Sequence, residues 1–162
     1  MEKHTKVTDP VGFGTARYTV ELIRDSRDGP RVIERRVADN LVVNIGKINI
    51  LRLAADLTSK AMDNIRVGTS GAAAASNQTN VLSPVSGTLT ALNSQTMSGR
   101  TLQLMFSYAS GSGSISATGI REVAILAQNT SPGGSCFSRA VFAAVNKTTS
   151  DKLKITYELK IS

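Results

Sequence analysis

Strict alternation of apolar and polar residues marks the end of the chain. The apolar positions are Leu153, Ile155, Tyr157, Leu159 and Ile161, and mostly charged residues stand between them. Because successive side chains of a strand project to opposite faces, residues 152–161 are predicted to form a strand with one buried face. A similar run, 136–145, precedes it across the polar segment 146–151. We expect the two runs to form a β-hairpin that closes the chain.

Comparable runs predict further strands, separated by turn-forming residues. Residues 17–22 and 31–37 flank the sequence RDSRDGP and should form a first hairpin. Predicted strands also cover 64–68, 101–108 and 120–127, and the last of these is apolar enough to be largely buried. Residues 69–80 are small and polar and predict a loop, whereas 81–91 shows no clear pattern because Pro84 and Gly87 disfavour a central strand.

One segment has helical periodicity. Its apolar stripe consists of Ile45, Ile48, Leu51 and Ala55, widened by Ala54 and Leu57. This spacing predicts one amphipathic helix over about residues 45–59, with the stripe packed on a sheet or over its open end.

Six to eight strands with one helix indicate a mainly β protein, an antiparallel β-sandwich or barrel. Pro10, Gly12 and Gly14 break any regular element near the start, so residues 1–14 are expected to be an extended N-terminal arm. Residues 15–162 are expected to be a single β-rich domain, which is an ordinary length for one hydrophobic core.

Charge is unevenly distributed. The formal net charge is +7, which suits an acidic partner, yet the basic residues do not cluster as a nucleic-acid-binding arm would. Between Val67 and Ile120 the only Asp, Glu, Lys or Arg is Arg100. Such a stretch is either a set of neutral polar loops or a surface that meets other subunits, since interface cores are depleted in charge.

Groups for catalysis or metal binding are scarce. His4 is the only histidine and Cys136 the only cysteine, so neither a zinc site nor a histidine-dependent nucleophile can be assembled in the core. Glu122 and Glu158 lie in predicted strands, where they are more typical of ion pairs than of general acids. We therefore expect no enzyme activity, no cofactor and no small-molecule substrate. No apolar run approaches the ~20 residues that cross a bilayer, so no membrane role is expected.

Six basic residues are candidates for contact with other subunits. Three arginines stand in neutral or apolar surroundings, and three lysines share the polar face of the last strand. They are Arg100, Arg121, Arg139, Lys152, Lys154 and Lys160. Each is either a solvated strand side chain or half of an interface ion pair, for which the guanidinium fork is well suited.

Three segments in order carry a resemblance. They are NLVVNIGKINILRLAADL (40–57), NIRVGTSGAAAASNQTNVLSP (64–84) and GIREVAILAQNTSPGGSCFSRAVFAAVNKTTSDKLKITYELKI (119–161). Together they resemble a family of small structural proteins of tailed bacteriophages and prophages. The closing motif of that family is matched by Arg139, Phe142, Val145, Asn146, Lys147, Asp151, Leu153, Ile155 and Tyr157. The chain departs from the family at 121–124, where a Gly would be expected after an acidic residue and Ala.

The resemblance implies a virion component, assembled in the host cytoplasm, rather than an enzyme. A short chain with an N-terminal arm and a charge-poor middle suits a capsid decoration (cement) protein. Its partners would be the major capsid protein or other virion subunits, and we expect a homo-oligomer. A tail, baseplate or tail-fibre adaptor is the alternative. A nucleic-acid-binding module is the third hypothesis, although Phe106 and Tyr108 are expected in the core and not on a base-stacking surface.

Overall fold

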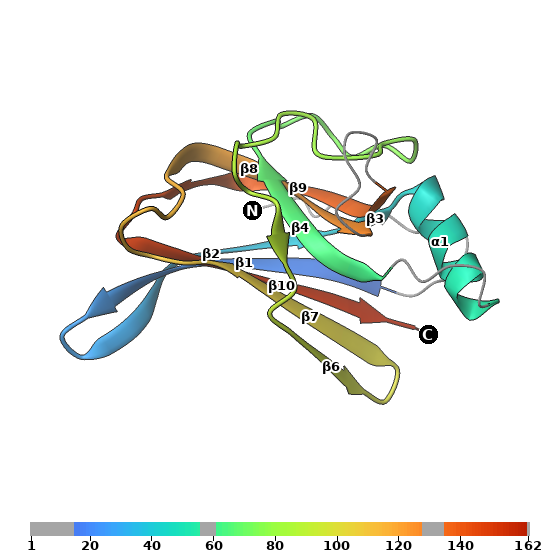
Figure 1. The fold of residues 1–162 in the computed structure, drawn as a ribbon, viewed down its shortest axis with the longest axis horizontal. Helices are drawn as coiled ribbons and strands as arrows, with labels where there is room; N and C mark the ends of the chain where they lie inside the picture. Colours follow the sequence, from blue (N-terminus) through green and yellow to red (C-terminus); the bar gives the residue numbers. More distant parts are fainter. Residues whose placement is uncertain (1–14, 56–60, 128–134, 162) are drawn as a thin grey trace, which may run out of the picture.

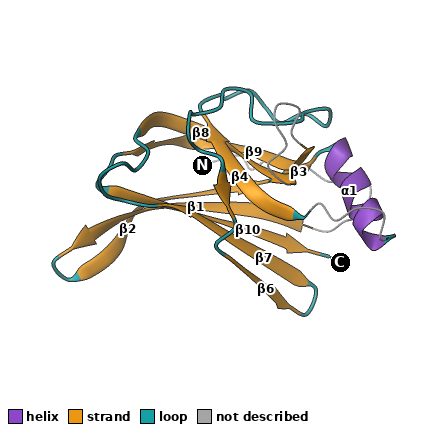
Figure 2. Ribbon diagram, viewed as in Figure 1, coloured by secondary structure: helices purple, strands orange, loops and turns teal. Residues whose placement is uncertain are grey.

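Two five-stranded antiparallel sheets, stacked face to face, make up most of the computed structural model, which describes residues 15–55, 61–127 and 135–161 (Figures 1 and 2). Sheet A has the order β2-β1-β10-β7-β6 and sheet B the order β3-β9-β8-β4-β5. The strands of sheet A are β1 (Thr15–Ser26), β2 (Gly29–Asp39), β6 (Ser94–Ser98), β7 (Thr101–Tyr108) and β10 (Asp151–Lys160). Those of sheet B are β3 (Leu41–Val42), β4 (Met62–Gly68), β5 (Thr90–Ala91), β8 (Ala117–Ala127) and β9 (Ser135–Lys147). The predicted β-sandwich is therefore confirmed.

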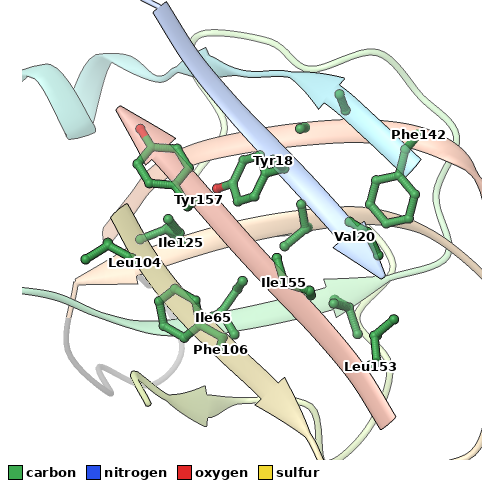
Figure 3. Packing of buried hydrophobic residues seen from close by; sticks show 14 of the residues in the cluster. Tyr18, Val20, Ile65, Leu104, Phe106, Ile125, Phe142, Leu153, Ile155 and Tyr157 are labelled. Carbon is green, nitrogen blue, oxygen red and sulfur yellow. The ribbon is translucent and has the colours of Figure 1, made fainter. Parts of the chain in front are cut away.

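The main core lies between the inner faces of the two sheets (Figure 3). β10 crosses it centrally and buries Leu153, Ile155 and Tyr157 completely, as its alternation predicts. The Tyr157 ring lies 5.0 Å from that of Tyr18 on β1, centroid to centroid, in a tilted arrangement favourable for aromatic pairs. The Tyr18 hydroxyl shares a 2.6 Å hydrogen bond with the Ser138 hydroxyl of β9 and so links the two sheets.

The closing β-hairpin is the one strand pairing that was predicted wrongly. β9 pairs with β8 and β3 in sheet B, whereas β10 pairs with β1 and β7 in sheet A. The polar residues between them therefore carry the chain from one sheet to the other. A hairpin and such a crossing have the same pattern, two alternating runs around a turn, because both place one face of each strand in the core. The β1–β2 hairpin, in contrast, is confirmed.

Sheet B is buried on both faces, which sheet A is not. Along β8, Val123 and Ile125 point into the main core, while Ala124 and Leu126 join a second apolar cluster on the other side. Val43, Val81 and Cys136 complete this second cluster. The predicted buried strand at 120–127 is thus confirmed, and the segment between β4 and β5 lies over its outer side (Figure 1).

The helix α1 (Asn44–Ala54) exists where predicted, but its buried face differs. Ile48 and Leu51 of the predicted stripe are 48% and 63% exposed, whereas Gly46 and Asn49 are buried. A Cβ at Gly46 would collide with the backbone of Phe137, so the glycine lets the helix approach β9 closely. Close backbone contact at Gly46 sets the rotation of this helix, and Ile45 of the predicted stripe packs against the second apolar cluster. Residues 56–59 of the predicted helix and the N-terminal arm lie outside the described residues.

Candidate functional site

A buried ion pair on the outer side of sheet B joins two of the residues that the sequence singled out. Arg139 of β9 and Glu122 of β8 are both fully buried, and Nη2 of the arginine lies 2.7 Å from Oε2 of the glutamate. The arginine Nε also donates to the same oxygen, at 2.8 Å. This two-pronged contact matches the planar guanidinium fork.

The glutamate is satisfied by the loop that follows β4. Its Oε1 accepts from the backbone N–H groups of Ser70 and Ser83, at 3.1 and 2.8 Å, and its Oε2 accepts from that of Leu82 at 2.9 Å. A buried carboxylate needs such donors because its desolvation is otherwise too costly. The donors come from both ends of the loop, so one side chain holds the loop onto the sheet.

The arginine holds the middle of the same loop. Its Nη1 donates to the side-chain oxygen of Gln78 at 3.1 Å, and its Nη2 donates to the carbonyl of Ala72 at 3.0 Å. We call Glu122, Arg139 and loop residues 69–85 the loop clamp. Arg139 therefore corrects an expectation: its guanidinium is used inside the chain and offers nothing to another subunit from this position. Glu122 does form an ion pair, but an internal one.

The loop clamp also explains part of the charge-poor stretch. Residues 69–85 cover sheet B and satisfy Glu122 through backbone groups. A further charged side chain directed at this buried pair would lack a countercharge, which favours neutral residues in the loop. Gly68 illustrates the crowding, because a Cβ there would collide with the Glu122 carboxylate and the Ser83 carbonyl. Sequence reasoning missed Gln78, since a single neutral amide in a polar loop carries no signal of burial beside an arginine.

A second network fixes the crossing between the sheets. Asp151, at the start of β10, accepts from Arg24 Nε at 2.7 Å, and from the backbone N–H and hydroxyl of Thr148 at 3.1 and 2.6 Å. The pKa of Asp151 is lowered to about 2, mainly by the hydrogen bond from Arg24. Burial alone would raise this pKa, whereas the two hydrogen bonds from Thr148 lower it further. Beside it, the Lys147 ammonium donates to the carbonyls of Ile115 and Thr148, and burial lowers the pKa of Lys147.

The three lysines of β10 lie along the outer face of sheet A, from one end of the strand to the other, as the alternation predicts. Lys152 and Lys160 are exposed, and Lys154 Nζ lies 3.4 Å from the Glu21 carboxylate of β1. Arg35 on β2 also approaches Glu21, at 3.7 Å. Nothing among the described residues covers this face, which mixes both signs of charge with a basic excess. Lys152 and Lys160 therefore present their charges to solvent, whereas Lys154 and Arg35 share the largely buried Glu21 carboxylate.

The two remaining arginine candidates are exposed, and one of them lies beside the end of β10: the Arg100 carbonyl accepts from the N–H of Ile161, the residue after Lys160, at 3.0 Å. Arg100 stands in the turn between β6 and β7, and Arg121 lies on β8 at the rim of the loop clamp. The structure thus places Arg100 near the Lys160 end of the lysine row on sheet A, leaves Arg121 exposed at the loop clamp, and buries Arg139 as a structural arginine.

Comparisons with known proteins do not identify a relative of this chain. No protein-family model, no curated protein and no solved structure matches this chain. Over residues 15–55, 61–127 and 135–161, no three His, Cys, Asp or Glu side chains are grouped so that they could hold a metal ion. In the same part of the chain, no helix is both long enough and apolar enough to span a membrane.

Proposed function

We propose that this chain is a non-enzymatic structural subunit of a tailed-phage virion, and that it decorates the capsid. The observation that carries the proposal is the closing motif, because its matched residues stabilise the β-sandwich. Five of them, Phe142, Val145, Leu153, Ile155 and Tyr157, are core side chains. A motif that holds a sandwich together supports a shared scaffold and a structural role more than a shared reaction.

The polar residues of the motif support the same reading. Arg139 belongs to the loop clamp, and Lys147 and Asp151 fix the crossing between the sheets. The Asn146 side chain accepts from the backbone N–H of Gly119 at 2.8 Å and joins the crossing to β8. Each polar group is therefore engaged with the chain's own backbone or with a countercharge.

The outer face of sheet A is the docking surface in this proposal. Its lysine row offers positive charge to an acidic neighbour, and a chain of net charge +7 would be steered toward a negative shell. Binding of this kind should weaken as salt rises, because exposed charges are screened.

The proposed location of the chain on the capsid is tested by its copy number per particle and by its position in electron micrographs. Quantitative mass spectrometry of purified particles gives the ratio of this chain to the major capsid protein, and electron microscopy compares particles with and without its gene. A ratio near that of a shell subunit, with density lost from the head surface, is expected. A ratio near that of tail proteins, with density lost from the tail, would instead favour the tail or baseplate adaptor.

The nucleic-acid-binding hypothesis has its own test. It requires DNA binding whose affinity falls steeply with salt, because counterions are released when lysines neutralise phosphates. We expect binding near background, since Phe106 and Tyr108 are buried and unavailable for base stacking.

A further inference from the structure

The strand β6 forms an edge of sheet A that is open and uncharged. All of its side chains, Ser94 to Ser98, are exposed, and Met97 is 74% exposed. Among residues 15–55, 61–127 and 135–161, β6 pairs with β7 alone, from Ser98 opposite Thr101 to Ser94 opposite Met105. An edge strand with an unpaired row of N–H and C=O groups can accept another strand unless something blocks it.

The opposite edge of the same sheet is blocked. β2 begins with Gly29-Pro30, its register shifts opposite Leu22/Ile23, and Glu34 pairs with Arg36 beside the inner face. Proline, a bulge and inward charges are the devices by which natural sheets prevent edge-to-edge pairing. β6 carries none of them, and the contrast within one sheet shows that only one of its two edges is protected.

The turn after β6 determines which backbone groups are free. Because Gly99 and Arg100 alone separate Ser98 from Thr101, these two residues must be a hydrogen-bonded pair. Bonded and non-bonded pairs alternate along an antiparallel ladder, so Thr96 and Ser94 also bond to β7. The N–H and C=O groups of Gln95 and Met97 therefore point away from β7, toward the open edge.

We propose that β6 pairs with β6 of a second copy of this chain, antiparallel about a two-fold axis at Thr96. Gln95 of each copy then exchanges both backbone hydrogen bonds with Met97 of the other, and the two A sheets become one. Such an interface is self-complementary, as two-fold symmetry requires. It also places Met97 beside the Gln95 side chain of the second copy and covers part of its exposed surface. The pairing does not depend on the proposed virion role.

Charge favours a second copy as the occupant. Two copies of the chain, each with a net charge of +7, repel one another overall. The strand β6, however, lies in the stretch 67–120, whose only Asp, Glu, Lys or Arg is Arg100. In the proposed register the Arg100 residues lie at opposite ends of the ladder. The same pairing through β2 would instead bring Arg31, Arg35 and Arg36 of one copy against those of the other.

Sedimentation of the full chain at low and high micromolar concentration tests the pairing. The wild type should form a dimer, and Thr96→Lys should raise its dissociation constant by about tenfold or more, because the two lysines would face each other across the axis. Thr96→Asp should weaken self-association in the same way. A mixture of the two variants should form a heterodimer through the Lys–Asp pair, which no purely structural role of Thr96 predicts.

Two further variants separate pairing from misfolding. Gln95→Pro removes an N–H that β7 does not use and should abolish the dimer while leaving the circular dichroism spectrum unchanged. Thr19→Lys, on the same outer face in the centre of the sheet, should leave the dimer intact. A wild type that stays monomeric, a Thr96→Lys dimer as tight as the wild type, or a chain that associates only with another protein would each overturn the proposal.

Discussion

The carboxylate of Glu122 and the guanidinium of Arg139 meet at 2.7 Å with both side chains fully buried, and between them they bind five groups of one loop. Two adjacent strands thus present a charged pair to a segment without charge of its own. The pair converts a loop of small polar residues into a fixed cover for sheet B.

Breaking this pair should be costly. Glu122→Leu or Arg139→Met alone should lower the free energy of unfolding by about 3–5 kcal/mol, because each leaves one buried charge uncompensated. The double variant should lose less than the sum of the two, since neither charge then remains. Chemical denaturation of the four proteins measures this cycle, and strictly additive losses would contradict the coupling.

Gly68 should not tolerate a methyl group. Gly68→Ala places a Cβ against the Glu122 carboxylate and the Ser83 carbonyl, and we expect a loss of about 1–3 kcal/mol in unfolding free energy. Gly71→Ala is the matched control, because its nearest atom would be Arg121 Nη1 at 3.6 Å, an ordinary contact. Gly68→Ala should melt at a clearly lower temperature than Gly71→Ala. Equal melting temperatures would show that the loop shifts to make room for the methyl group and would contradict the prediction.

Asp151 should make the fold sensitive to acid. Its pKa is about 2 when folded against an ordinary 3.8, so it stabilises the fold at pH values above 3.8 and loses this contribution as pH falls toward 2. The unscreened difference corresponds to about 2 kcal/mol, and the half-exposed Arg24 side chain makes the contribution smaller. Asp151→Asn should therefore be less stable than the wild type at pH 7, and the gap should narrow below pH 3.8 and close as pH falls through 2. A gap independent of pH would assign the effect to packing.

Reversing the lysine row should abolish docking if the outer face of sheet A contacts an acidic shell. The variant Lys152→Glu, Lys154→Glu, Lys160→Glu should bind depleted particles much more weakly than the wild type in a co-sedimentation assay. A control with the same change in net charge, Arg27→Glu, Arg31→Glu, Arg52→Glu, alters exposed residues on the β1–β2 hairpin and α1. Equal binding by both variants would mean that the lysine face is only solvated surface.

Cys136 should be unreactive in the native protein. Burial raises the pKa of its thiol to about 12, although Arg139 and a backbone hydrogen bond oppose the rise, so almost no thiolate exists at pH 8. Alkylation should be slow in buffer and complete in denaturant, at a rate in buffer that follows unfolding. Fast labelling of the native chain would contradict the burial of Cys136.

The sequence by itself determined the strands whose two faces differ. Alternation located β1, β2, β7 and β10 and identified Phe106 and Tyr157 as core residues, because a sandwich strand needs one apolar side. A continuous apolar run located β8, which is buried on both faces. It did not locate β6, whose side chains are all polar or exposed and carry no pattern. The N-terminal arm and the proposed partners stay predictions.

Only the tertiary structure decided the relations between elements. Whether β9 and β10 pair or cross between sheets depends on where other strands stand, and the same pattern serves both. The rotation of α1 depends on one glycine against Phe137, although Ile48 and Leu51 suggested another face. Arg139 looked like a candidate for contact with a partner until the fold placed Glu122 and Gln78 beside it. Periodicity records which side of an element is apolar, whereas the partner of a buried charge is set by residues far along the chain.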